Sequence, residues 1–182
     1  MILGLALLLS EIDNLVRTFA PPPKAIDDFM HELVSGKNNP IRTFLLVIVM
    51  APLLEEILFR GLILKSYLNR YSTQKALITS ALFFSIFHMN PWQMPSAFVG
   101  GLVLGWWFMA TGSLWPCIFA HALMNSLPAL FLQTNIEIQG FTNVEGPTQF
   151  QPWWLDLTGI LLVVVGVFLW KYFDSRTLSN TK

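Results

Sequence analysis

The chain has a single cysteine, few charged residues and no excess of either sign of charge. One cysteine, Cys117, cannot form a disulfide within the chain or a cysteine-based metal site. Its neighbours Trp115 and Pro116 favour a buried structural thiol. Eleven basic residues balance eleven acidic ones, and without a basic patch nothing supports nucleic-acid binding.

Charge is scarce because the chain is mostly apolar. Only 12% of its 182 residues are charged and 54% are hydrophobic, with a mean hydropathy of +0.56. Soluble domains are roughly 25% charged, so this composition indicates a membrane protein. Residues 1–9 are apolar but lack the basic start and the small-residue cleavage site of a signal peptide. They are short for a span of ~20 residues, and we expect them to form one end of a membrane helix.

Turn residues divide the chain into helical segments. After Pro21, Pro22 and Pro23, apolar residues recur at helical spacing over 26–34. This predicts an amphipathic helix at the membrane surface, closed by Gly36, with His31 solvated on its polar face. Five longer apolar segments follow, at about 41–67, 75–89, 95–111, 114–132 and 153–173. Within a bilayer they must be helices. The predicted fold is an all-α, polytopic transmembrane helical bundle of about five spans, a partial N-terminal one and the interfacial helix.

The predicted organisation has four parts: 1–39 with the partial membrane segment and amphipathic helix, a membrane core over 40–132, an external loop over 133–152, and a last membrane helix with a tail over 153–182. Basic residues set the orientation, because cytoplasmic loops are enriched in them. The connector with Lys65, Arg70 and Lys75 is predicted to be cytoplasmic, as is the C-terminus with Lys171, Arg176 and Lys182.

Glu55, Glu56 and Arg60 stand together inside the first long apolar segment. Each costs at least ~2.5–3.5 kcal/mol at bilayer depth, so the cluster is a functional-site hypothesis. Glu56 and Arg60 are four residues apart and can form an ion pair on one helix face. Glu55 points about 100° away from Glu56 and can face a different partner.

Three more polar residues lie in apolar surroundings: His88, His121 and Asn125. Counting from the expected cytoplasmic ends at ~1.5 Å per residue places Glu55, His88 and Asn125 at one depth, roughly 18–20 Å. The same count places His121 and Arg60 one to two turns shallower.

Taken singly, each of these residues has a structural interpretation: a buried ion pair for Glu56 and Arg60, helix-packing hydrogen bonds for the histidines and the asparagine. Together they favour hydrolysis, which needs a base for water and donors for an oxyanion. Two adjacent carboxylates in a low dielectric cannot both ionise cheaply, so one of them is expected to exchange protons.

Three motifs in this order resemble the CAAX prenyl protease and bacteriocin-processing family (CPBP, or type II CAAX endopeptidases). They are Glu-Glu-x-x-x-Arg, Phe-x-x-x-His and His-x-x-x-Asn, and they fall at Glu55, Glu56 and Arg60, at Phe84 and His88, and at His121 and Asn125. The resemblance covers about residues 40–132. It implies that Glu55 and His88 activate water, that His121 and Asn125 stabilise the oxyanion, and that Glu56 and Arg60 orient the site.

The resemblance further implies an intramembrane peptidase in the bacterial inner membrane, acting on a membrane-associated peptide or protein. We expect no required cofactor. Zinc is the alternative, with Glu55, His88 and His121 as ligands, but the sequence shows neither His-Glu-x-x-His nor a carboxylate placed to orient each histidine. Two other functions remain open: a non-catalytic immunity or scaffold protein, and a proton-coupled transporter, which has less support because no inverted repeat is visible.

Overall fold

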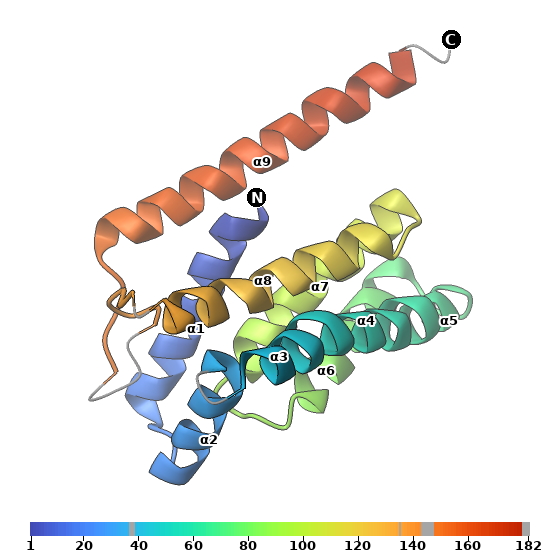
Figure 1. Ribbon diagram of the computed structural model, residues 1–182. Helices are drawn as coiled ribbons and strands as arrows, with labels where there is room; N and C mark the ends of the chain where they lie inside the picture. Colours follow the sequence, from blue (N-terminus) through green and yellow to red (C-terminus); the bar gives the residue numbers. More distant parts are fainter. Residues whose placement is uncertain (37–38, 135, 143–147, 180–182) are drawn as a thin grey trace.

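The computed structural model describes residues 1–36, 39–134, 136–142 and 148–179, the last seven as backbone only, and in these ranges it is built from helices without strands (Figure 1). A long helix over 40–68 contains two π-helical segments, η1 and η2. In chain order the elements are α1 Ile2–Phe19, α2 Lys24–Ser35, α3 Pro40–Thr43, η1 Phe44–Met50, α4 Ala51–Glu56, η2 Ile57–Leu64, α5 Lys65–Leu68, α6 Thr73–Phe87, α7 Met94–Thr111, α8 Trp115–Gln133 and α9 Trp153–Ser179.

Each predicted apolar segment contains a helix in the structure. α2 is the predicted amphipathic helix and ends at Gly36, whose φ of 63° is the left-handed conformation expected of a C-terminal glycine. Gly112 ends α7 in the same way, with φ of 64°. The segment predicted over 75–89 becomes α6, which stops at Phe87, so His88 lies just beyond a helix end.

Three of the described helices are long and apolar enough to cross a membrane: α7, α8 and the Trp153–Tyr172 part of α9. The predicted number of about five spans is not confirmed. α6 has only 15 residues, about 22 Å at ~1.5 Å each against a hydrocarbon core of ~30 Å. The long helix over 40–68 carries the charged cluster in its middle. The predicted partial first segment forms α1, which packs against α9 and α7.

Small residues bring α6, α7 and the long helix close together. Ala97, Gly101 and Gly105 form a row with four-residue spacing on α7, and all three are buried. A Cβ atom at Gly101 would lie 3.1 Å from the Cα atom of Ala81 on α6, and one at Gly105 would lie 2.6 Å from the side chain of Leu77. The row therefore sets the close approach of these helices, as its spacing predicts. Cys117 is fully buried against α7, with Sγ 3.4 Å from the carbonyl of Leu104.

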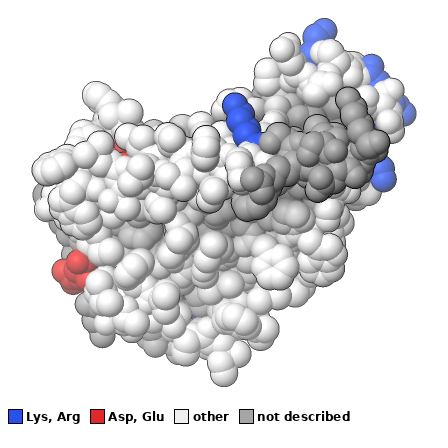
Figure 2. All heavy atoms as spheres, turned by 90° about the horizontal axis from the view of Figure 1, so that it is seen from above, with Lys and Arg blue, Asp and Glu red and all other residues white. Residues whose placement is uncertain are grey.

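Few charged side chains reach the face seen from above in Figure 2. Lys and Arg gather at one end of this face, and Asp and Glu are visible toward the other. The orientation in a membrane stays a prediction. Part of the predicted external loop, Lys182 and the side chain of Arg176 lie outside the described residues.

Candidate active site

Glu56 and Arg60 form the predicted ion pair at the junction of α4 and η2. Arg60 Nη1 donates to Glu56 Oε1 over 2.8 Å, and the side chains are only 1% and 0% exposed. Arg60 Nη2 also donates to the carbonyl of Gly101 over 3.1 Å. The guanidinium lies 4.4 Å above the centroid of the Phe84 ring. Arg60 therefore ties the long helix to α7 and α6 at once.

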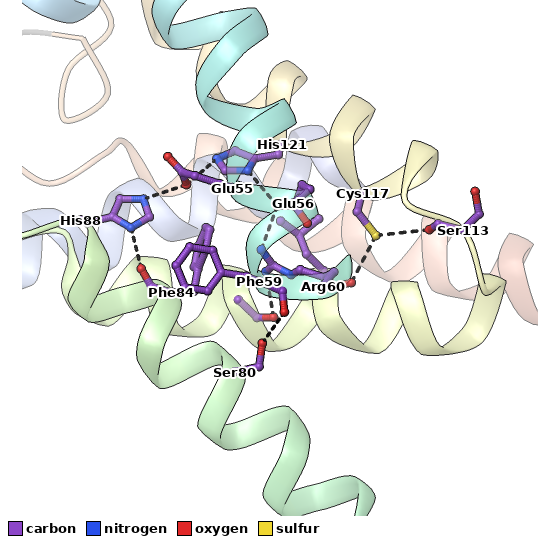
Figure 3. A network of polar contacts seen from close by, with 12 residues as sticks. Glu55, Glu56, Phe59, Arg60, Ser80, Phe84, His88, Ser113, Cys117 and His121 are labelled. Atoms are coloured by element: carbon purple, nitrogen blue, oxygen red, sulfur yellow. Dashed lines mark hydrogen bonds and ion pairs between the residues drawn. The ribbon is translucent and has the colours of Figure 1, made fainter. Parts of the chain in front are cut away.

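His121, on α8, faces both glutamates (Figure 3). Its Nδ1 lies 2.9 Å from Glu56 Oε1, and the histidine is buried. Because a carboxylate only accepts, Nδ1 carries the hydrogen and Nε2 is left to act on another group. The sequence showed no carboxylate placed to orient a histidine, and this expectation is wrong for His121. Glu56 does so from a different helix, which sequence spacing cannot show.

Glu55 lies between the two histidine rings (Figure 3). Its Oε2 is 4.0 Å from His88 Nε2 and 3.9 Å from His121 Nε2. This oxygen is buried and has no hydrogen-bond partner within the described residues, although 18% of the side chain is exposed. The predicted difference in direction between Glu55 and Glu56 agrees with these contacts: both lie at His121, but on opposite ring nitrogens, and Arg60 pairs with Glu56 while His88 lies beside Glu55.

His88 is held by its own helix rather than by a carboxylate. Its Nδ1 lies 2.8 Å from the carbonyl of Phe84, and a carbonyl only accepts. In the neutral ring the hydrogen is therefore on Nδ1, and Nε2 has a free electron pair directed at Glu55. Met89, the next residue, has φ of 49°, which is unfavourable for a residue with a side chain. The chain thus turns away directly after placing His88.

Asn125 contacts the long helix, two turns before Glu55. Its Nδ2 donates to the carbonyl of Val47 over 2.9 Å. In η1 the amide of Ala51 donates five residues back, to Leu46. The next donor in this register would be residue 52, which is a proline and has no N–H. Asn125 therefore supplies the donor that Pro52 lacks for Val47.

Counting depth along each helix did not predict which of these residues meet. His121, predicted to be shallower, is the residue that contacts Glu55, whereas the hydrogen bond of Asn125 goes to Val47. Equal residue counts give equal depth only for helices that run parallel to the membrane normal, and tilted helices shift the layers. Roles in catalysis for Glu55, Glu56, Arg60, His88, His121 and Asn125 remain proposals.

The predicted alternative is a zinc site, and the distances between the possible ligand atoms test it. Both histidines present Nε2 and have Nδ1 engaged, as metal-binding histidines do. Tetrahedral zinc with bonds of about 2.0–2.1 Å sets its donors about 3.3–3.4 Å apart, and the separations here are 4.0 and 3.9 Å. Across the described residues, no group of three or more His, Cys, Asp or Glu side chains is placed to hold a metal ion. As arranged, these residues do not fit a metal.

A cavity of about 450 Å³ reaches the site. His88, His121 and Asn125 line one part of it, and α1, α2, α7 and the loops after α6 and α8 line most of the rest. Glu55 touches both histidine rings but is not itself among the described lining residues. His31, predicted to be solvated, is partly buried and lines this cavity from α2. Asp13 on α1 also lines it. No role for Asp13 was predicted from the sequence, where an acidic residue in an apolar helix was the available signal.

A family match covers the region that holds these residues. The family model described as "Type II CAAX prenyl endopeptidase Rce1-like" matches residues 37–127. An uncharacterized 24.3 kDa protein of Escherichia coli is 33% identical over 112 residues, which cover 58% of this chain and 52% of that protein. The chain thus spans about half the length of this curated relative. No solved structure matches the chain.

Proposed function

The chain belongs to the Rce1-like family of type II CAAX prenyl endopeptidases, and from this premise we propose that it is an integral-membrane endopeptidase that hydrolyses a peptide bond near or within the membrane. Family membership and three apolar helices make it a membrane protein of a protease family. The bacterial inner membrane, a cytoplasmic C-terminus and a membrane-associated peptide substrate are part of the proposal.

One observation carries the proposal: Glu55 Oε2 is buried, lacks a hydrogen-bond donor among the described residues, and lies between two imidazole Nε2 atoms. A water with hydrogen bonds of about 2.8 Å to two atoms sets them about 4.0–4.6 Å apart. The separations of 4.0 and 3.9 Å are close to that range. The gap between Glu55 and the histidines therefore suits one water molecule held for attack.

Glu55 and His88 serve as the base in this mechanism. The water gives a proton to the Glu55 carboxylate, and its oxygen attacks the carbonyl carbon of the substrate. The electron pair on His88 Nε2 orients the other water hydrogen, because Nδ1–H is held by the Phe84 carbonyl. The proton then passes to the leaving nitrogen, the C–N bond breaks, and a carboxylic acid and an amine are released.

His121 serves as the oxyanion donor. To donate from Nε2 while Nδ1 donates to Glu56, the ring must be the doubly protonated imidazolium. The adjacent Glu56 carboxylate stabilises this charged form, and Arg60 holds Glu56 in place. Asn125 uses one Nδ2 hydrogen on Val47, which leaves the second hydrogen for the oxyanion. A preformed donor of this kind contributes ~10²–10³-fold to a rate.

The alternative is a non-catalytic immunity or scaffold protein that keeps the polar cluster for folding. The network of Glu56, Arg60 and His121 suits this function, since its members bond one another. Glu55 suits it less well: Oε2 of each glutamate is buried without a partner among the described residues, but Glu56 Oε1 accepts from Arg60 and His121, whereas no such bonds hold Glu55.

The test is hydrolysis of a set of apolar membrane peptides by the purified chain in lipid nanodiscs, read by mass spectrometry. Glu55→Gln preserves shape and removes the base, and we expect a ~10²–10⁴-fold loss of rate with unchanged helix content. Glu137→Gln is the matched control, since Glu137 is exposed in the loop after α8. Normal turnover by Glu55→Gln would rule out this mechanism.

A further inference from the structure

One acidic residue of the cavity has no role in the proposed hydrolysis. α1 presents a single face to the cavity, with residues at helical spacing: Ala6, Leu9, Ser10, Asp13, Asn14 and Arg17. The same cavity is lined by His88 and His121. Any peptide that reaches the histidines through this cavity passes along this face of α1.

The carboxylate of Asp13 is incompletely partnered. Its Oδ1 is buried and has no hydrogen-bond partner in the described part of the chain. Ser96, on α7, lies beside this carboxylate, and its single hydroxyl hydrogen is shared between Asp13 and the carbonyl of Gln93, 2.9 Å away. A buried acceptor without a donor is destabilising, and a ligand that supplies the donor recovers part of that cost.

The other charges of the lining cancel. Of the described lining residues, Arg17 is the one Lys or Arg, and Asp27 is the second carboxylate. Arg17 Nη1 donates to Asp27 Oδ1 over 2.6 Å. This pair joins α1 to α2 and neutralises both charges. Asp13 is therefore the carboxylate of the described lining that has no ion pair, and burial raises its pKa to about 7. A cation placed beside it favours the charged form.

Asp13 lies one turn further along α1 than a residue that packs on α7. Leu9 is that residue: a Cβ atom at Gly100 would lie 3.4 Å from Leu9 Cδ1. Asp13 follows ~5–6 Å further along the helix, and Arg17 follows after another turn. A side chain that contacts Asp13 therefore belongs to a different substrate residue from one that packs on Leu9.

We propose that Asp13 forms a cation-binding subsite that selects peptides with a lysine or arginine side chain near the scissile bond. The inference rests on the proposed function and adds the substrate class. A basic side chain donates to Oδ1 and balances the charge of Asp13 in a surrounding that excludes most water. A glutamine can donate without balancing the charge, and a glutamate is repelled, so the charge of the peptide residue decides the preference.

The experiment uses the full chain in nanodiscs and apolar peptides with a fluorescent label. The peptides are identical except for one residue, which is lysine, glutamine or glutamate and is moved along the peptide. Binding is measured to Glu55→Gln, which does not turn the peptide over. We expect the lysine peptide to bind roughly 10–100-fold more tightly than the glutamine peptide at one position. Glu55→Gln with Asp13→Asn should lose this ratio.

Two further variants control for charge and folding. Asp28→Asn removes the same charge from α2, where the side chain is 62% exposed, and it should keep the lysine preference. Asp13→Glu retains the charge and should keep a reduced preference if Asp13→Asn fails to fold. The binding of lysine and glutamate peptides is also compared on protein that keeps Asp13. This comparison tests the charge preference without any variant at position 13.

Each outcome of the experiment either supports or overturns the subsite at Asp13. Equal binding of the three peptides, no binding of any, or a preference that survives Asp13→Asn overturns the subsite. Cleavage of the peptides by the wild-type chain without a lysine preference overturns the subsite and leaves the peptidase. A lysine preference that depends on Asp13, without cleavage of any peptide, supports the subsite and contradicts the proposed peptidase.

Discussion

Glu55 and Glu56 carry the same carboxyl group one residue apart on α4 and share His121 as a neighbour, but they differ in the hydrogen bonds that hold them. Glu56 Oε1 accepts from Arg60 over 2.8 Å and from His121 over 2.9 Å. Glu55 Oε2 lies 3.9 and 4.0 Å from two imidazole nitrogens and has no donor among the described residues. A rotation of about 100° per residue thus separates a structural carboxylate from one available for reaction.

The largest expected effect is a difference in the free energy of unfolding between variants of the two glutamates. Glu56→Gln leaves the Arg60 guanidinium buried without its counter-charge, and we expect a loss of about 3–5 kcal/mol. Glu55→Gln removes a carboxylate that already lacks a donor and should leave stability unchanged or raised. Thermal unfolding of both variants in one detergent gives the comparison. Similar losses for both would show that Glu55 also has a structural partner.

Asn125 sharpens the comparison, because it combines two roles. Its side chain donates to the carbonyl of Val47 in the structure, and the proposed mechanism adds a hydrogen bond to the oxyanion. Asn125→Ala leaves the Val47 carbonyl without a donor and should cost about 1–3 kcal/mol. Pro52→Ala restores a backbone N–H at residue 52, so Asn125→Ala should cost less in that background. Unfolding of both single variants and the double variant measures the coupling.

Activity in the same series separates the two roles. If Asn125 also donates to the oxyanion, the double variant recovers stability but stays slow. Full recovery of activity along with stability would reduce Asn125 to a positioning residue. An equal cost of Asn125→Ala in both backgrounds would contradict the account of Pro52.

Two neighbouring glycines on α7 provide a smaller test. It concerns the helix packing around Arg60, the ion-pair partner of Glu56. A Cβ atom at Gly101 would meet the backbone of Ala81 at 3.1 Å, whereas one at Gly100 would meet only Leu9 Cδ1 at 3.4 Å. Gly101→Ala should cost about 1–3 kcal/mol by overpacking and displace the carbonyl that Arg60 bonds. Gly100→Ala, the matched control, should be neutral or stabilising by up to ~1 kcal/mol, since alanine favours helix. Equal melting temperatures would contradict the close packing of α6 on α7.

The smallest expected effect is that of metal removal. Because the donor spacing does not fit tetrahedral zinc, peptidase activity should survive exhaustive chelation by EDTA and 1,10-phenanthroline. Activity is measured before and after dialysis into metal-free buffer, with a known zinc peptidase treated in parallel. Loss of activity that added zinc restores would show that Glu55, His88 and His121 close around a metal.

The sequence predicted most helix positions because apolar runs bounded by Gly, Pro and polar residues leave few alternatives in a bilayer. The segment predicted over 95–111 is the helix Met94–Thr111, and the one over 114–132 is Trp115–Gln133. The pair of Glu56 with Arg60 was also predictable, since both residues lie on one helix. What depends on two helices was not: the contact of His121 with Glu56 and the hydrogen bond of Asn125 to Val47 follow from tilt and packing, which residue counts do not contain.

The two π-helical segments on either side of α4 also constrain how this chain can change length. In η1 and η2 backbone amides donate five residues back, from Ala51 to Leu46 and from Lys65 to Arg60. Removal of one residue from η1 would return that turn to the four-residue register of an α-helix. Because a five-residue turn holds one residue more than a four-residue turn, this loss would be absorbed there, and Glu55 and Glu56 would keep their directions. A residue lost from α4 itself would instead turn everything after it by about 100° relative to everything before it. The long helix is therefore tolerant of a one-residue deletion in η1 or η2 and intolerant of one in α4.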